Sequence, residues 1–231
     1  MQFIETASFG SRVAGKLTKR PSLGVTLQYS FSTISRLFLL PLLLSLSFMI
    51  ESGLSIQLFL LTSFFLTISA FFTSLAVLIK FNYFQLLFQA IFREYQFSTV
   101  PVSIVKVIFG KKIEFDQIDL KDIPRIRTLS VKKIFFSSLA YSFLSAGFLV
   151  SFSLAILVPE YRMTMSQFTT AFQGVGIIIL TMYIDPMISK SLDIELENIY
   201  WVKNIYSILI GRVLAYLFTS ISFIVFYLYM Y

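Results

Sequence analysis

The chain has 231 residues, of which 57% are hydrophobic and only 13% are charged. A soluble domain of this size carries about a quarter charged residues, so this composition predicts a protein whose outer surface faces lipid. Cys and His are both absent, which excludes disulfides, thiolate nucleophiles, His general bases and the common zinc ligands.

Six apolar segments follow one another along the chain and predict an all-α, polytopic integral membrane bundle of about six transmembrane helices, forming a single membrane domain over 1–231. Their predicted bounds are 2–15, 22–50, 54–79, 134–158, 167–185 and 205–230. Five are long enough to cross roughly 30 Å of hydrocarbon at 1.5 Å per residue. The first is marginal, because it is short and contains Glu5 and Arg12. The fifth is expected to end at Asp185, because Pro186 lacks an N–H and restricts the residue before it.

Basic residues in the connections set the predicted orientation. The loops that hold most of the Lys and Arg outside the apolar segments are 16–21, 80–133 and 186–204. The alternate loops hold only Arg162 between them. Because loops rich in Lys and Arg stay in the cytoplasm, the three basic loops are predicted to be cytoplasmic, and both termini then face outward if residues 1–15 cross the membrane.

The net charge of +7 fits either nucleic acid or anionic lipid, and the long loop 80–133 decides between them. Aromatic residues that could stack on bases are sparse among its basic residues, so we expect a solvated connector beside lipid headgroups and no nucleic-acid partner. Residues 82–97 of this loop are rich in aromatic residues and are expected either to prolong the third helix or to lie at the membrane interface.

Three arginines lie inside the apolar segments: Arg12, Arg36 and Arg212. Each costs about 2.5–3.5 kcal/mol at mid-bilayer on an insertion scale, less if its side chain reaches the headgroups. The predicted orientation puts all three in the cytoplasmic halves of their helices. Together with Lys16 and Lys19 they would form an anion pocket open to the cytoplasm, since the planar guanidinium donates two parallel hydrogen bonds to a phosphate. The alternative is that each Arg snorkels separately to the headgroups and only helps to orient its helix.

The N-terminal residues also carry a family resemblance. The pattern consists of Ile4-Glu5-Thr6, Ser11-Arg12, Ala14-Gly15, Thr18-Lys19 and Ser35-Arg36. It resembles the Amj family of bacterial lipid II flippases, in which an IET…SR.AG..TK helix is followed by a helix with a Ser-Arg pair. The pair Asp185-Pro186 also resembles a feature of that family. The resemblance is specific over residues 4–36.

Membership of that family would imply a multi-pass protein of the bacterial inner (cytoplasmic) membrane that moves lipid II, the undecaprenyl-diphosphate-linked precursor of peptidoglycan, to the outer leaflet. The expected diphosphate-binding residues are Arg12, Arg36, Arg212, Lys16 and Lys19, and the expected counter-charges or carriers of a coupling proton are Glu5 and Asp185. Glu5 is expected to pair with Arg12 in the empty site.

Other functions stay open. The chain would alternatively move another undecaprenyl-diphosphate-linked oligosaccharide or a small solute, or act as a membrane scaffold subunit that transports nothing. No spacing of carboxylates singles out a catalytic pair, so we expect no enzyme, no catalytic residues, no cofactor and no metal. The expected partners are the lipid-linked glycan and the surrounding membrane lipids.

Overall fold

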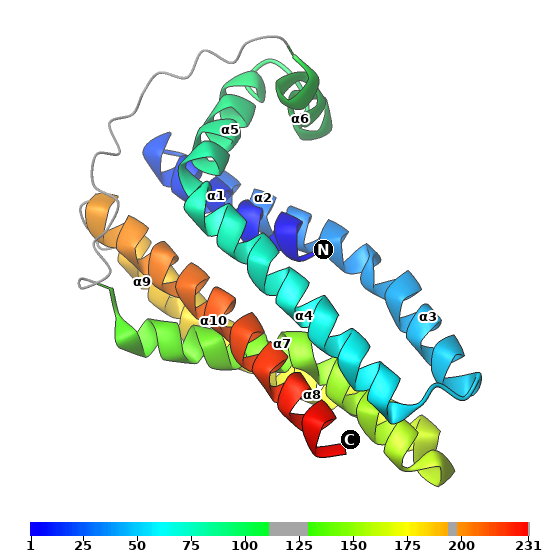
Figure 1. Ribbon diagram of the computed structural model, residues 1–231. Coiled ribbons are helices and arrows are strands. Elements are labelled where there is room, and N and C mark those ends of the chain that lie inside the picture. Colours follow the sequence, from blue (N-terminus) through cyan, green and yellow to red (C-terminus); the bar gives the residue numbers. More distant parts are fainter. Residues whose placement is uncertain (111–128, 194–197, 231) are drawn as a thin grey trace.

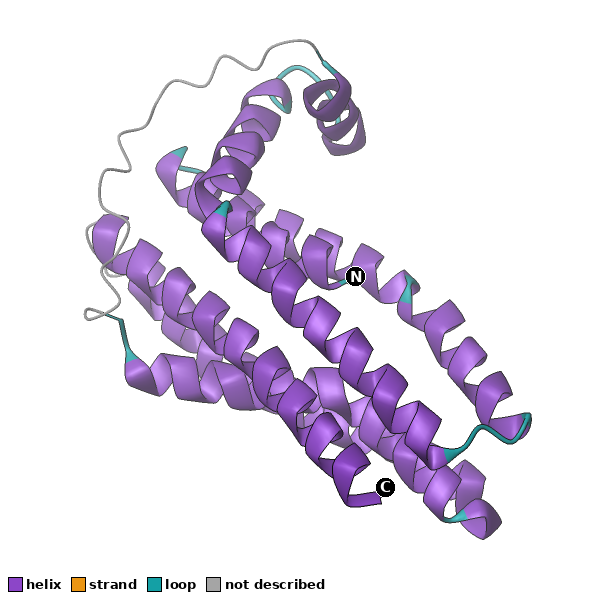
Figure 2. Cartoon of the chain, viewed as in Figure 1, coloured by secondary structure: helices purple, strands orange, loops and turns teal. Residues whose placement is uncertain are grey.

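The computed structural model describes residues 1–110, 129–193 and 198–230, and every element in these ranges is helical (Figure 2). The elements in chain order are α1 (Gln2–Leu17), α2 (Pro21–Leu37), α3 (Leu39–Glu51), α4 (Ile56–Ile79), α5 (Phe81–Glu94), α6 (Val100–Phe109), α7 (Val131–Leu157), the 3₁₀ turn η2 (Pro159–Tyr161), α8 (Arg162–Ile179), the π-helical turn η3 (Leu180–Ile184), α9 (Asp185–Asp193) and α10 (Asn198–Met230).

Helical stretches long and apolar enough to cross a bilayer occur five times in the described residues. They are Pro21–Glu51, Ile56–Ile79, Val131–Leu157, Pro159–Ser191 and Trp201–Met230. Large apolar side chains such as Leu44, Phe72 and Phe226 are exposed on their outer surfaces, where lipid rather than water is the favourable neighbour. The chain is therefore an all-α, polytopic membrane bundle, as its sequence predicts.

The helices run back and forth between two ends of the bundle (Figure 1). The stretch α2–α3 runs from one end to the other and α4 returns, while α7, then α8 with α9, and finally α10 do the same on the other side. The long α10 packs against both α4 and α7, and α7 packs against α8. Buried aromatic and aliphatic side chains fill these contacts, with Trp201 and Phe81 in one cluster and Phe59 and Phe152 in another.

The sequence leaves open whether the first helix, α1, crosses the membrane. Its 16 residues span roughly 24 Å at 1.5 Å per residue, less than a bilayer core. Gln2, at its start, contacts Tyr216 near the middle of α10, while Lys16, at its end, contacts Trp201 near the start of α10. α1 therefore runs from the interior of the bundle to one end of it. Its charged face, with Glu5 and Arg12, contacts α2, α9 and α10, while α4 and α5 pack on its other sides.

Two of the long stretches are irregular beside a proline. The predicted segment 22–50 is divided at Phe38 into α2 and α3, because Pro41 has no N–H to bond the carbonyl one turn before it. The prediction that a helix ends at Asp185 is wrong. The Asp185 N–H instead bonds the Leu180 carbonyl in a π-helical turn, and the chain continues helically through Pro186 as α9. The wider π turn accommodates Pro186, which has no N–H to donate, so the helical stretch continues past it.

The predicted connector 80–133 contains two helices. α5 follows α4 after a bend at Lys80 and packs against α1, and α6 packs back on α5 (Figure 1). Both are too short to cross a bilayer. Residues 111–128 of the predicted connector, with their basic residues, lie outside the described residues.

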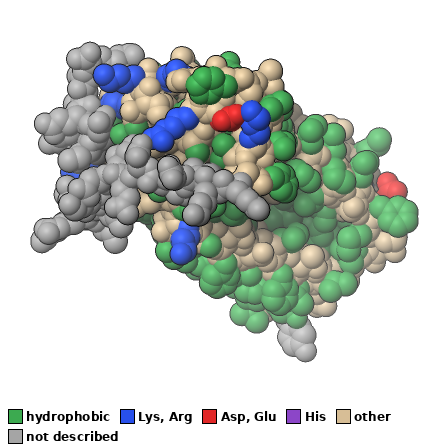
Figure 3. Space-filling view, turned by 90° about the horizontal axis from the view of Figure 1, so that it is seen from above, with side chains coloured by type: hydrophobic (Ala, Val, Ile, Leu, Met, Phe, Trp, Pro, Cys, Tyr) green, Lys and Arg blue, Asp and Glu red, His purple; other side chains and the backbone are tan. Residues whose placement is uncertain are grey.

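Charge and apolar surface are unevenly distributed over the molecule. On the face drawn in Figure 3, Lys and Arg gather towards one end and hydrophobic side chains cover much of the other. The end of α1 with Lys16 and Lys19, and the start of α7 with Lys132 and Lys133, belong to the same end of the bundle. We call this the basic end.

Candidate functional site

Small residues bring the polar helix α1 close to α2. An added Cβ at Gly24 would lie only 2.5 Å from the carbonyl oxygen of Ser11 and 3.1 Å from the Cα of Gly15. The Ser11 hydroxyl donates to the Gly24 carbonyl at 2.8 Å. This backbone-to-backbone approach is the kind that small residues permit between membrane helices. It fixes α2 beside the face of α1 that carries Glu5 and Arg12.

A cavity of about 210 Å³ lies between α1, α2, α7, α10 and the stretch α8–η3–α9. Its lining combines apolar residues such as Phe9 and Leu144 with charged ones. The charged side chains that line it are Glu5, Arg12, Arg36, Asp185 and Arg212. Five charges that are widely separated in the sequence thus meet at one place, and the cations outnumber the carboxylates by one.

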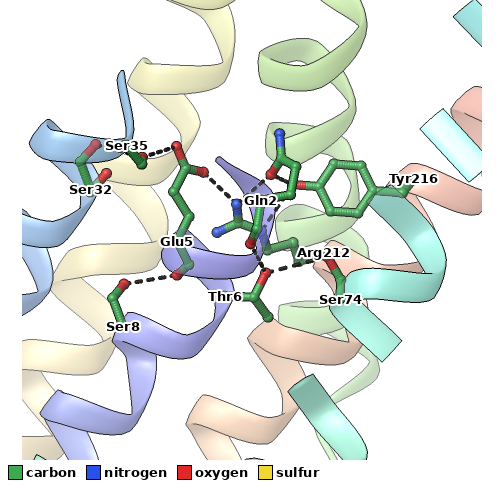
Figure 4. A network of polar contacts seen from close by, with 9 residues as sticks. All are labelled: Gln2, Glu5, Thr6, Ser8, Ser32, Ser35, Ser74, Arg212 and Tyr216. Carbon is green, nitrogen blue, oxygen red and sulfur yellow. Dashed lines mark hydrogen bonds and ion pairs between the residues drawn. The ribbon is translucent and has the colours of Figure 1, made fainter. Parts of the chain in front are cut away.

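The first ion pair of the cavity joins Glu5 and Arg212 (Figure 4). Arg212 is almost fully buried, donates through Nη2 to the Glu5 carboxylate and to Gln2 Oε1 (2.7 Å), and donates through Nε to the hydroxyl of Tyr216 at 3.0 Å. The other Glu5 oxygen accepts from Ser35 at 2.7 Å. A buried charge is tolerated when it is paired and its hydrogen bonds are made, which is the case here.

The second ion pair joins Arg12 and Asp185. Arg12 Nη2 donates to Asp185 Oδ1 at 3.1 Å, and the hydroxyl of Tyr29 donates to Asp185 Oδ2 at 2.9 Å. The Arg12 guanidinium also lies over the Tyr29 ring at 5.5 Å. Arg12 is 4% exposed, and its Nε finds no hydrogen-bond partner in the described residues. The two ion pairs have the same arrangement: each carboxylate accepts one hydrogen bond from an arginine and one from a hydroxyl group of α2.

Arg36 is the third cation of the cavity and differs from the other two. It is exposed, and among the described residues it has no hydrogen-bond or ion-pair partner. It lies halfway between Pro21 and Glu51, the two ends of its membrane-length stretch. This differs from the expectation that all three arginines lie in cytoplasmic halves. An unpaired Arg at this depth costs about 2.5–3.5 kcal/mol, and such residues are functional candidates by default.

The remaining predicted site residues have other positions. Lys16 lies with its ammonium 5.6 Å from the Trp201 ring and Lys19 is exposed, and neither lines the cavity. The expected pair Glu5–Arg12 does not form: Glu5 pairs with Arg212, and Arg12 pairs with Asp185. The reason is geometric: two turns of α1 separate Glu5 from Arg12, about 10 Å along the axis, and other helices supply nearer partners.

Several site residues escaped the sequence analysis: Gln28, Tyr29, Ser32, Tyr141 and Tyr216. Tyr29, Ser32 and Arg36 stand at i, i+3 and i+7 on α2, the same spacing that marks Glu5, Ser8 and Arg12 on α1. That periodicity could have revealed a polar face on α2. Tyr141, whose ring lies 4.6 Å from the Arg212 guanidinium, gave no such signal, because aromatic residues are common throughout the apolar segments.

Comparison with known protein families, with known proteins and with solved structures finds no match to this chain. Its class therefore rests on the fold and the cavity alone. It is a polytopic α-helical membrane protein whose helices enclose a charged cavity. Polar cavities between membrane helices, at depths far from either surface, are typical of transporter binding sites.

Proposed function

We propose that the protein is a flippase that moves lipid II, the undecaprenyl-diphosphate-linked peptidoglycan precursor, from the cytoplasmic to the outer leaflet of the bacterial inner membrane. The observation that carries the proposal is that Arg12, Arg36 and Arg212, from three different helices, line one cavity within a membrane bundle. The resemblance of residues 4–36 to the Amj family supplies the choice of substrate.

The diphosphate is the part of this substrate that suits the cavity. Guanidinium groups bind phosphate oxygens through paired, charge-assisted hydrogen bonds, and Arg36 is free to make them. The volume of about 210 Å³ is below the roughly 300–1,000 Å³ of sites that enclose drug-sized ligands. It therefore matches a compact anionic group, whereas the disaccharide and its peptide are too large to enter with it unless the helices separate.

The ion pairs suggest how the substrate is received and released. The anion binds Arg36 and competes with Glu5 and Asp185 for the arginines they hold, so each pair opens only when the diphosphate replaces its carboxylate. When the anion leaves, the carboxylates close the pairs again and the buried guanidinium groups are never left without a partner. With the basic end in the cytoplasm, loading takes place from the cytoplasmic leaflet.

Complementation tests the function. A bacterium is depleted of its own lipid II flippases while it expresses this protein, and lipid II in the outer leaflet is measured together with growth. Restored growth with restored outer-leaflet lipid II is expected for the native chain but not for Arg12→Ala or Arg36→Ala expressed at the same level. Full activity of both variants would contradict the role of the cavity.

The two alternatives give other results in the same strain. A flippase for another lipid-linked oligosaccharide fails to complement, yet its depletion in the native host makes that glycan precursor accumulate in the cytoplasmic leaflet. A scaffold subunit tolerates Arg36→Gln and Arg36→Leu in its native host, because a scaffold does not need an unpaired charge inside the membrane.

A further inference from the structure

Most of the residues that line the cavity are buried or half-buried. The exposed ones lie mainly on two elements that face each other. Apart from Met1, its exposed lining residues are Tyr29 and Arg36 on α2 and, across from them, Ile177 on α8 and Thr181 in η3. α2 and α8 do not pack closely against one another. Between them we therefore recognise a mouth, defined here as the gap between α2 and α8–η3.

The residues on both sides of this mouth lie near the middle of their membrane-length stretches. Arg36 is midway along Pro21–Glu51, and Ile177 is close to the middle of Pro159–Ser191. At 1.5 Å per residue, Arg36 is about 22 Å from either end of its stretch, and Ile177 is about 21 Å and about 27 Å from the two ends of its own. An opening so far from both ends faces hydrocarbon. The neighbouring side chains agree, because Leu37, Leu40, Ile178 and Met182 beside it are 55–75% exposed and apolar.

A positive charge in such an opening is a candidate binding group for an anion from the membrane itself. Arg36 has no partner in the described residues, and behind it Arg12 Nε and Gln28 Oε1 are buried without hydrogen-bond partners. Buried polar atoms of this kind call for a ligand or water that completes them. A soluble anion would have to cross apolar side chains to reach them, while a lipid with an anionic headgroup already has its tail in place.

We propose that the gap between α2 and α8–η3 is a lateral portal through which the diphosphate of a membrane-embedded polyprenyl lipid enters the cavity, with Arg36 as its first contact and its tail left against Ile177 in the bilayer. The proposal rests on the proposed function for its ligand class. The hydrogen bond from Tyr29 to Asp185 joins α2 to α9 across the gap on the side of the basic end, so this bond must open for a diphosphate that arrives from the cytoplasmic leaflet.

Photocrosslinking from adjacent positions tests the portal. Benzoylphenylalanine replaces either Ile177, which lines the cavity, or Ile178, which is exposed beside it and does not line it. The full-length proteins are reconstituted in phospholipid vesicles that contain a small fraction of tritiated polyprenyl diphosphate. Relative to crosslinked phospholipid, position 177 is expected to capture the polyprenyl diphosphate at least about tenfold more than position 178. Arg36→Ala should remove this enrichment.

Two results would overturn the portal: equal capture at both positions, or full suppression of capture at 177 by soluble diphosphate at equal concentration, which would mean access from water. Failure of the proposed function is visible separately. If capture at 177 persists while the chain fails to complement lipid II transport, the portal stands and serves another lipid-linked diphosphate. Thr181 and Met182 provide a second pair of lining and non-lining neighbours if the variants at 177 and 178 differ in yield.

Discussion

Glu5 and Arg212 are 207 residues apart in the chain, yet the carboxylate of the first accepts a hydrogen bond from the guanidinium of the second inside the bundle. The contact ties the short helix α1 to the middle of α10. The pair Arg12–Asp185 ties the same helix to α9. α2 is joined to both carboxylates through hydroxyl groups, whereas α9 and α10 are joined to α1 through ion pairs.

Removing one partner of the Glu5–Arg212 pair should destabilise the fold more than removing both. Glu5→Gln leaves Arg212 buried without a counter-charge, and such a change typically costs about 3–5 kcal/mol. The double variant Glu5→Gln/Arg212→Gln should recover at least half of that loss. Reversible unfolding of the purified proteins in mixed micelles measures the cycle. Effects of the two single changes that simply add in the double variant would show that the pair contributes no coupling.

Arg36 should matter for ligand binding and hardly at all for stability. Because it has no partner to lose among the described residues, Arg36→Ala is not expected to lower the free energy of unfolding. A lost charged hydrogen bond is worth about 1.5–3 kcal/mol, so polyprenyl diphosphate should bind roughly 10- to 100-fold more weakly. Arg36→Lys keeps the charge but not the planar guanidinium, so its affinity should lie between that of the native chain and that of Arg36→Ala.

Arg162 offers a control for Arg36, because it is the first residue of α8, at the far end of that helix from η3, and does not line the cavity. Arg162→Ala should bind the polyprenyl diphosphate as the native chain does, in a titration followed by tryptophan fluorescence or by equilibrium filtration. Equal weakening in the Arg36 and Arg162 variants would point to a general effect of net charge rather than to the cavity.

The sequence predicts the class of fold well because the hydrophobic periodicity of long membrane helices is local information. The five long stretches follow directly from apolar runs, and the cost of placing Arg12, Arg36 and Arg212 inside apolar segments marks them as candidate site residues. The partner of each charge is not local information. Nothing near Glu5 in the sequence indicates that its partner is Arg212, because that pairing depends on how α1 and α10 pack.

At two further places the structure differs from, or decides between, the predictions for local reasons that the hydrophobic pattern does not show. A proline predicts the end of a helix at Asp185, but one extra residue in a π turn is enough to carry the helix past Pro186, and no sequence signal marks that extra residue. The length of α1 is near the limit for a membrane span, and its polar face at Glu5 and Arg12 is compatible either with crossing or with lying inside the bundle. The contact of Gln2 with the middle of α10 places the start of α1 inside the bundle.

Removing the Tyr29 hydroxyl should widen the gap between α2 and α8. Tyr29→Phe keeps the ring over Arg12 but loses the hydrogen bond to Asp185, which costs about 1 kcal/mol at a partly exposed carboxylate. Since the chain has no Cys, spin labels on Ser30→Cys and Ile178→Cys report this gap without background. The distance distribution should broaden and shift to longer values by several ångströms.

The corresponding change at Tyr83 is the control for Tyr29→Phe. Tyr83 is exposed on α5 and does not line the cavity, so Tyr83→Phe should leave the label distances unchanged. If Tyr29→Phe also leaves them unchanged, the hydrogen bond to Asp185 does not restrain α2.

Two glycines should respond in opposite directions to the same substitution. A Cβ at Gly24 would lie 2.5 Å from the Ser11 carbonyl oxygen and 3.2 Å from the Cα of Arg12, whereas nothing lies within 4 Å of a Cβ at Gly174. Backbone atoms cannot move aside as a flexible side chain can. Gly24→Ala should therefore push α2 away from α1 and destabilise the protein by about 1–3 kcal/mol, as overpacking does. Gly174→Ala, in the interior of α8, should stabilise it by about 0.5–1 kcal/mol through its better helix propensity.

Thermal unfolding of the two purified variants measures this difference, and outer-leaflet lipid II in the depleted strain measures its consequence. Because α2 carries Tyr29, Ser35 and Arg36, displacing it at Gly24 disturbs every contact that α2 makes with the cavity, so Gly24→Ala should also lose transport. Gly174→Ala should keep it. Equal stability of the two variants would mean that α1 and α2 do not approach as closely as their glycines allow, and the positions of Glu5 and Arg12 relative to α2 would then need another explanation.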